Sequence, residues 1–114
     1  MPILEFETSE SGSVAVVGLV GELDLAGAER LGQEIERLGA APGVETVVLD
    51  LRELEFMDSS GLREIVTAGS TLRAAQRELA LVPGPDTVMR VFEITRMAER
   101  MTFVDAPDAP EAAA

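Results

Sequence analysis

The chain has 114 residues, of which nine are arginine and 21 are acidic, so its net charge is −12, and it contains no cysteine, histidine or lysine. This length fits one domain, and the missing residue types exclude disulfides, thiolate zinc sites, Ser-His and Cys-His catalysis and lysine-dependent phosphate loops. These absences leave open a metal or glycosidase site built from carboxylates alone, but nothing in the sequence points to one. We therefore expect a protein that is not an enzyme and that holds neither a metal ion nor another cofactor.

Charge and hydropathy also restrict the partners. The arginines are scattered singly along the sequence rather than gathered into a patch, and the excess negative charge repels nucleic acid and anionic lipid. The longest mainly apolar run, residues 14–20, is far shorter than the ~20 residues that a membrane helix needs. We expect no nucleic-acid partner, no membrane contact and a cytoplasmic location, and the sequence leaves the oligomeric state open.

The first two predicted elements form a β-hairpin. Residues 3–8 and 14–20 are apolar and β-branched, and the polar stretch 9–13 between them is typical of a turn. An amphipathic helix follows, because apolar residues then recur at intervals of three and four, and residues 39–43, with two glycines and a proline, end it. The predicted buried residues of this helix are Leu25, Ala28, Leu31, Ile35 and Leu38.

Strands and helices then alternate along the chain. Residues 44–51 contain a continuous apolar run, as expected of a central strand that helices cover on both faces. A second helix follows, residues 78–82 predict another strand, a third helix runs over residues 86–95, and residues 101–104 predict a short strand. The predicted inward residues of the second and third helices are Leu62, Ile65, Val66, Gly69, Leu72, Val88, Val91 and Phe92.

This order of elements predicts the fold class. A β-hairpin followed by alternating helices and strands predicts an α/β domain in which a mixed β-sheet is packed with crossover α-helices. The domain is expected to cover residues 1–104. Residues 105–114 contain only acidic residues, proline and alanine, which predicts a disordered tail.

The string FMDSSGL, residues 56–62, lies between a predicted strand and the second helix. Asp and Ser are strong N-cap residues, so one interpretation is that Asp58 and Ser59 only cap the helix. The other is that the helix N-terminus, with free N–H groups and a positive dipole end, receives a phosphate carried on Ser59 or Ser60. Gly61 has no side chain and would let another protein approach the backbone closely. The residues alone leave both interpretations open.

Four short strings occur in order along the chain: GELD at residues 21–24, VLDL at 48–51, MDSSGL at 57–62 and VMRVF at 88–92. Together they resemble the STAS domain family, in particular the bacterial anti-sigma factor antagonists, over residues 3–104. The resemblance implies a single STAS-like domain. It also implies partner switching: the unmodified antagonist binds an anti-sigma factor that is a Ser/Thr kinase, the sigma factor is freed, and phosphorylation of the antagonist reverses this.

The resemblance implies roles for particular residues. Ser59 matches the phosphorylated serine, with Ser60 as the second choice, and Asp58 would orient the loop. Glu22 and Asp24 resemble the acidic contacts to the kinase, although they can also be interpreted as turn residues only. A Ser phosphatase is a further candidate partner. The implied partner surface consists of Glu22, Asp24, Asp58, Ser59, Ser60, Gly61 and Arg63.

Two residues depart from the family pattern. Arg63 stands where many antagonists have glycine, which puts a cation one turn from Ser59 that would pair with a phosphate or change the choice of partner. Arg96 replaces a glycine that often ends the third helix, so the helix either runs on or ends with a strained residue. The alternative function is a non-switching STAS adaptor subunit of a signalling or lipid-transport complex, in which Ser59 is only a cap.

Overall fold

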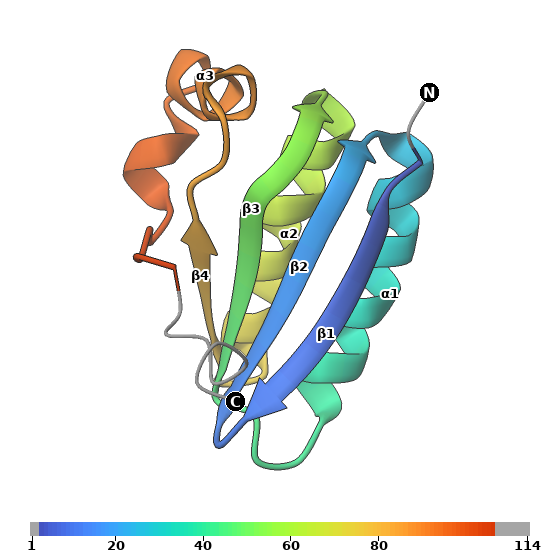
Figure 1. The fold of residues 1–114 in the computed structure, drawn as a ribbon. Coiled ribbons are helices and arrows are strands. Elements are labelled where there is room, and N and C mark those ends of the chain that lie inside the picture. Colours follow the sequence, from blue (N-terminus) through green and yellow to red (C-terminus); the bar gives the residue numbers. More distant parts are fainter. Residues whose placement is uncertain (1–2, 107–114) are drawn as a thin grey trace.

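The structure is a computed structural model that describes residues 3–106, which form a four-stranded sheet and three α-helices (Figure 1). The predicted tail, residues 105–114, lies outside the described residues from residue 107 onward. In chain order the elements are β1 (Glu5–Ser11), β2 (Val14–Leu23), α1 (Leu25–Ala40), β3 (Thr46–Met57), α2 (Ser59–Ala74), β4 (Glu78–Val82), α3 (Asp86–Ile94) and the short 3-10 helix η1 (Met97–Arg100).

The sheet is mixed and has the strand order β1-β2-β3-β4. β1 is antiparallel to β2, whereas β2, β3 and β4 are parallel to one another. The predicted α/β class, the opening hairpin and the crossover helices are therefore confirmed. The hairpin turn is shorter than predicted, because pairing continues to Ser11 and only Gly12 and Ser13 connect the strands. Gly12 has a φ of 61°, which glycine adopts without strain.

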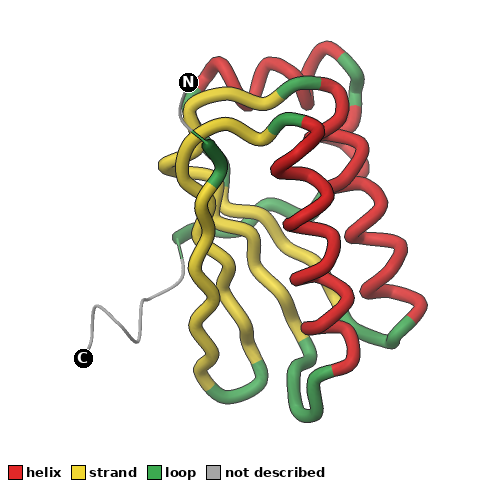
Figure 2. Tube along the Cα trace, turned by 90° about the vertical axis from the view of Figure 1, so that its right-hand side faces the viewer, coloured by secondary structure: helices red, strands yellow, loops and turns green. Residues whose placement is uncertain are grey.

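The two long helices, α1 and α2, lie on the same face of the sheet (Figure 2). The main core fills the space between them and the strands, and its fully buried residues include Leu19, Leu31, Leu49, Ile65, Leu72 and Phe92. The expectation that helices cover both faces of β3 is wrong. Val48 instead packs with Ala80 and Val82 in a separate small cluster. A run of three apolar residues shows that both faces of the strand are covered, because successive side chains point to opposite faces. It does not show whether helices or neighbouring strand residues cover each face.

β3 is longer than predicted. The strand continues from Leu51 to Met57, where a loop was expected. The buried residues of this stretch, Leu51, Leu54 and Met57, are three apart instead of two. Their spacing follows from two register shifts in the pairing with β2, because each shift adds a residue to one strand and changes which face the next side chain occupies.

The predicted inner faces of the helices are largely confirmed. Leu25 is an exception: it is the first residue of α1, and 62% of it is exposed. In α2 the buried set includes Ala68, which the sequence analysis did not select. Three predicted inward residues are half-buried: Val66, Gly69 and Val91.

The end of the described chain also differs from the prediction. Residues 101–104 do not form a strand. Within this range only Phe103 pairs with the sheet, in an isolated bridge to Leu81 of β4. α3 ends at Ile94, and Arg96 lies just beyond it with a left-handed φ of 63°. Of the two outcomes expected for Arg96, the strained ending is confirmed. Only glycine adopts this backbone region freely.

Glu64 makes the helix packing sensitive to pH. Its carboxylate on α2 lies 3.1 Å from the place that a Cβ on Gly32 of α1 would take. Partial burial, assisted by the charge of Glu36, raises the pKa of the Glu64 carboxyl above its ordinary value of 4.5. A raised carboxyl pKa means that folding disfavours the charged form. This residue therefore destabilises the fold as the pH rises through its raised pKa and has no such effect below its ordinary pKa.

We expect the Glu64→Gln variant to have a higher free energy of unfolding than the wild type at neutral pH and the same value near pH 3, where both side chains are neutral. Urea denaturation at the two pH values measures this difference. Glu29→Gln, at an exposed position of α1, is the control and should show little change. An effect of Glu64→Gln that is equal at both pH values would contradict the charge explanation.

Candidate functional site

The string at residues 56–62 lies at the edge of the sheet where β2 and β3 end and where α1 and α2 begin (Figure 1). Parallel pairing places Leu23 next to Met57. One residue later, the backbone N–H of Asp58 donates to the carbonyl oxygen of Leu23 over 3.3 Å. The fold thus brings residues 21–24 and 56–62 side by side.

The two helices at this edge begin in the same way. The carboxylate of Asp24 accepts a hydrogen bond from the backbone N–H of Gly27, and that of Asp58 accepts one from Gly61, each over 3.0 Å. The cap interpretation of Asp58 is therefore confirmed. Ser59 does not cap the helix. It is the first residue of α2, and its side chain forms no hydrogen bond within residues 3–106.

The candidate phosphate acceptors lie on the first turn of α2. Ser59 is exposed and Ser60 is half-buried. The backbone N–H groups of a first helical turn, together with the helix dipole, favour a negative group at this position. Arg63 is also exposed and lies four residues after Ser59, on the same face of the helix. It forms no ion pair within the described part of the chain.

Gly61 has a different role from the one expected. It is buried, and a Cβ at this position would lie 2.6 Å from the carbonyl oxygen of Leu23 and 2.8 Å from the Cγ of Met57. The space beside Gly61 is thus filled by the ends of β2 and β3, so another protein does not gain close approach to the backbone there. The glycine is needed because α2 begins against the sheet edge.

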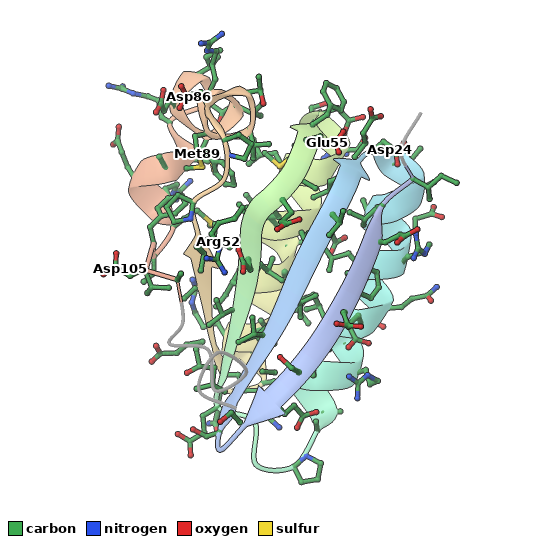
Figure 3. The ribbon with its side chains drawn as sticks, in the orientation of Figure 1. Asp24, Arg52, Glu55, Asp86, Met89 and Asp105 are labelled. Carbon is green, nitrogen blue, oxygen red and sulfur yellow. The ribbon has the colours of Figure 1, made fainter. Side chains whose placement is uncertain are left out.

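Three carboxylates lie on the two chain segments that meet at this edge of the sheet. Glu22, Asp24 and Asp58 are half-buried, and none of them forms an ion pair with any residue among 3–106. We call these residues the acidic edge. Of the two residues that were also interpreted as turn residues, Glu22 belongs to β2, whereas Asp24 is the single residue that connects β2 to α1, and it caps that helix. Figure 3 shows Asp24 near the end of the sheet where Glu55 of β3 also lies.

Exposed apolar side chains lie beside the acidic edge, and none of them was predicted from the sequence as a site residue. Ile3 bridges to Glu22 on one side, and Phe56 pairs with Glu22 on the other. Ile3 is 76% exposed and Phe56 46% exposed, and the exposed Leu25 directly follows Asp24. Phe56 has a recognisable sequence feature, since it falls within the FMDSSGL string. Exposed apolar groups next to charges are typical of protein-binding surfaces.

Two further kinds of site are missing from the described part of the chain, a metal-binding cluster and a membrane-spanning helix. Among the described residues, no group of three or more acidic side chains is arranged to hold a metal ion. None of the helices that the structure describes combines the length and the apolar character needed to cross a membrane.

Comparisons with known proteins place this arrangement in context. The STAS domain profile matches residues 5–109. The anti-sigma-B factor antagonist of Listeria monocytogenes is 35% identical over 81 residues, which cover 71% of this chain and 70% of that protein. The unphosphorylated form of the anti-sigma factor antagonist SpoIIAA has a similar structure, with a TM-score of 0.78, 24% identity and 96% of each chain covered.

SpoIIAA is also known in a second state. The phosphorylated form of this Bacillus cell fate determinant matches with a TM-score of 0.71 and 23% identity, over 96% of this chain and all of the other. At these identities the structural similarity concerns the fold.

Proposed function

The chain belongs to the STAS domain family, and from this premise we propose that it is an anti-sigma factor antagonist that binds an anti-sigma factor kinase through the acidic edge and is switched by phosphorylation of Ser59. The observation that carries the proposal is the position of Ser59. It is exposed at the N-terminus of α2, next to carboxylates that have no ion-pair partner within residues 3–106.

Docking would use both the acidic edge and the exposed apolar side chains beside it. The acidic edge attracts basic groups of the partner and speeds the encounter, because charges of opposite sign steer two proteins together. Phe56, Leu25 and Ile3 supply apolar area that the partner would cover. Aromatic side chains in particular tend to contribute much of the binding energy at such interfaces. In this proposal the protein acts by binding, in the cytoplasm, and not as an enzyme.

Phosphorylation would change this surface strongly. A phosphate adds about −1.5 to −2 charges at Ser59, beside Asp58 and within reach of the N-terminus of α2. In the docked complex the same phosphate would have to lose its hydration, which is costly unless the partner supplies a matching cation. The helix N-terminus and Arg63 would stabilise the phosphate on the free protein and so favour the undocked state. A Ser phosphatase would restore the binding form.

The two capping aspartates allow the charge to be tested apart from the fold. Asparagine is about as good an N-cap as aspartate. We expect Asp24→Asn and Asp58→Asn to keep the free energy of unfolding within about 0.5 kcal/mol of the wild type and to weaken binding of the anti-sigma factor severalfold. Urea denaturation and calorimetric titration measure the two quantities. Unchanged affinity in both variants would remove Asp24 and Asp58 from the docking surface.

A displacement experiment tests the function as a whole. A labelled sigma factor is bound to the anti-sigma factor, and its fluorescence anisotropy is followed as the unphosphorylated protein is added. The proposal predicts a fall in anisotropy as the sigma factor is released. Binding of the protein without release would instead support the non-switching adaptor.

A further inference from the structure

A second polar feature lies at the other end of α2. Arg73 is in the last turn of this helix, about 21 Å beyond Ser59 at 1.5 Å per residue. An open pocket of about 310 Å³ lies there, lined by residues of α2, of the start of β4 and of the segment 100–102. Figure 1 shows how the chain returns beside β4 after α3. Arg73, Arg77 and Arg100 all line the pocket.

The charged residues that line the pocket are mainly positive, although the chain as a whole is acidic. Three of the nine arginines of a chain with a net charge of −12 line one opening, where Glu78 is the one acidic lining residue among residues 3–106. The expectation that the arginines are not gathered into a patch is therefore wrong in three dimensions. Their separation in the sequence concealed the cluster, because the crossover from α2 to β4 and the return of the chain after α3 bring distant residues together.

One arginine of the three has a structural task. The guanidinium of Arg77 donates hydrogen bonds to the carbonyl oxygens of Leu38 and Ala41, at the end of α1, over 3.3 and 2.7 Å. The side chains of Arg73 and Arg100 form no hydrogen bond or ion pair within residues 3–106. Like charges held at one opening repel each other, and a bound anion would relieve that repulsion.

We propose that this pocket binds a small molecule that carries a phosphate group. The planar guanidinium group donates parallel hydrogen bonds that match phosphate oxygens. The volume is at the lower end of the range for small-molecule sites, and Leu79 and Met101 offer apolar contacts to the remainder of the ligand. An acidic protein segment fits less well, because a pocket of this size takes in only one or two of its side chains.

Titration of the 15N-labelled full chain with pyrophosphate tests the proposal, with amide chemical shifts recorded at constant ionic strength. We expect saturable shifts at the lining residues Gly69, Leu79 and Thr102. Arg73→Ala and Arg100→Ala should each weaken binding at least about tenfold, because each removes a charged donor. Arg90→Ala, at an exposed position of α3 outside the pocket, is the matched control and should leave the affinity unchanged.

Several results would overturn the proposal. These are the absence of shifts at about 10 mM pyrophosphate, equal weakening by Arg90→Ala, shifts centred on residues 59–62 instead of the pocket, or tighter binding of a short glutamate peptide than of pyrophosphate. The result is independent of the switch at Ser59, since the two sites lie at opposite ends of α2. If the pocket proposal fails, the Ser59 switch is still tested by its own experiments, and the reverse also holds.

Discussion

Replacing Ser59 by aspartate is expected to weaken binding of the anti-sigma factor at least about 30-fold, whereas alanine at the same position leaves binding intact. Ser59 is exposed at the start of α2, so neither change disturbs buried packing. Aspartate brings a charge next to Asp58 that docking would have to desolvate, and a close charge that is made unfavourable in an interface costs ~2 kcal/mol or more. Calorimetric titration of the two variants measures the difference.

Ser70→Asp is the matched control for this experiment. Ser70 is exposed on the same helix, three turns beyond Ser59, so the substitution adds the same charge to the same element away from the acidic edge. Its affinity should stay within about threefold of the wild type, because charges that are exposed and distant are screened by salt. Equal weakening by the two aspartates would mean that net charge, not the position of Ser59, controls docking.

The Gly61→Ala variant is expected to lose about 1–3 kcal/mol of unfolding free energy. The added Cβ would lie 2.6 Å from a backbone carbonyl oxygen and 2.7 Å from the Cγ of Leu23, where only a shift of α2 or of the sheet edge makes room. The same shift moves Ser59 and the Asp58 cap, so binding of the anti-sigma factor should fall as well. Urea denaturation gives the stability, and calorimetric titration gives the affinity.

Gly69→Ala tests the same change at a permissive position of α2. A Cβ there would make an ordinary contact of 3.7 Å with the Cδ2 of Leu79. Alanine also loses less conformational freedom than glycine on helix formation, so this variant should be more stable than the wild type by about 0.5–1 kcal/mol. If both alanine variants were stabilised, Gly61 would not be packed against the sheet edge as described.

Elements with a regular period were predictable from the sequence. The spacing of Leu31, Ile35 and Leu38 places α1 on the sheet, and Pro83 to Pro85 end β4 as expected. The second half of β3 was not predictable, because its register shifts space the buried residues three apart. The placement of both long helices on one face of the sheet was also not predictable, because the short apolar run of β3 does not reveal which element covers each face.

The candidate site was predictable in its position but not in all its parts. The strings at residues 21–24 and 56–62 pointed to the sheet edge, because parallel strands end at the same edge of a sheet. The reason for Gly61 required the structure, since its neighbour Leu23 is distant in sequence. Leu25 was assigned to the core from its helical spacing, although a residue that starts a helix can lie beyond the edge of the sheet.

The central claim is that a phosphate on Ser59 controls docking, and one measurement tests it most directly. The protein is incubated with the anti-sigma factor kinase and ATP, the modified residue is located by peptide mass mapping, and the affinity for the anti-sigma factor is measured before and after. We predict a phosphate on Ser59 and an affinity at least about 30-fold lower. Full affinity of a preparation phosphorylated at Ser59, or an unmodified Ser59 after complete reaction, would contradict the account.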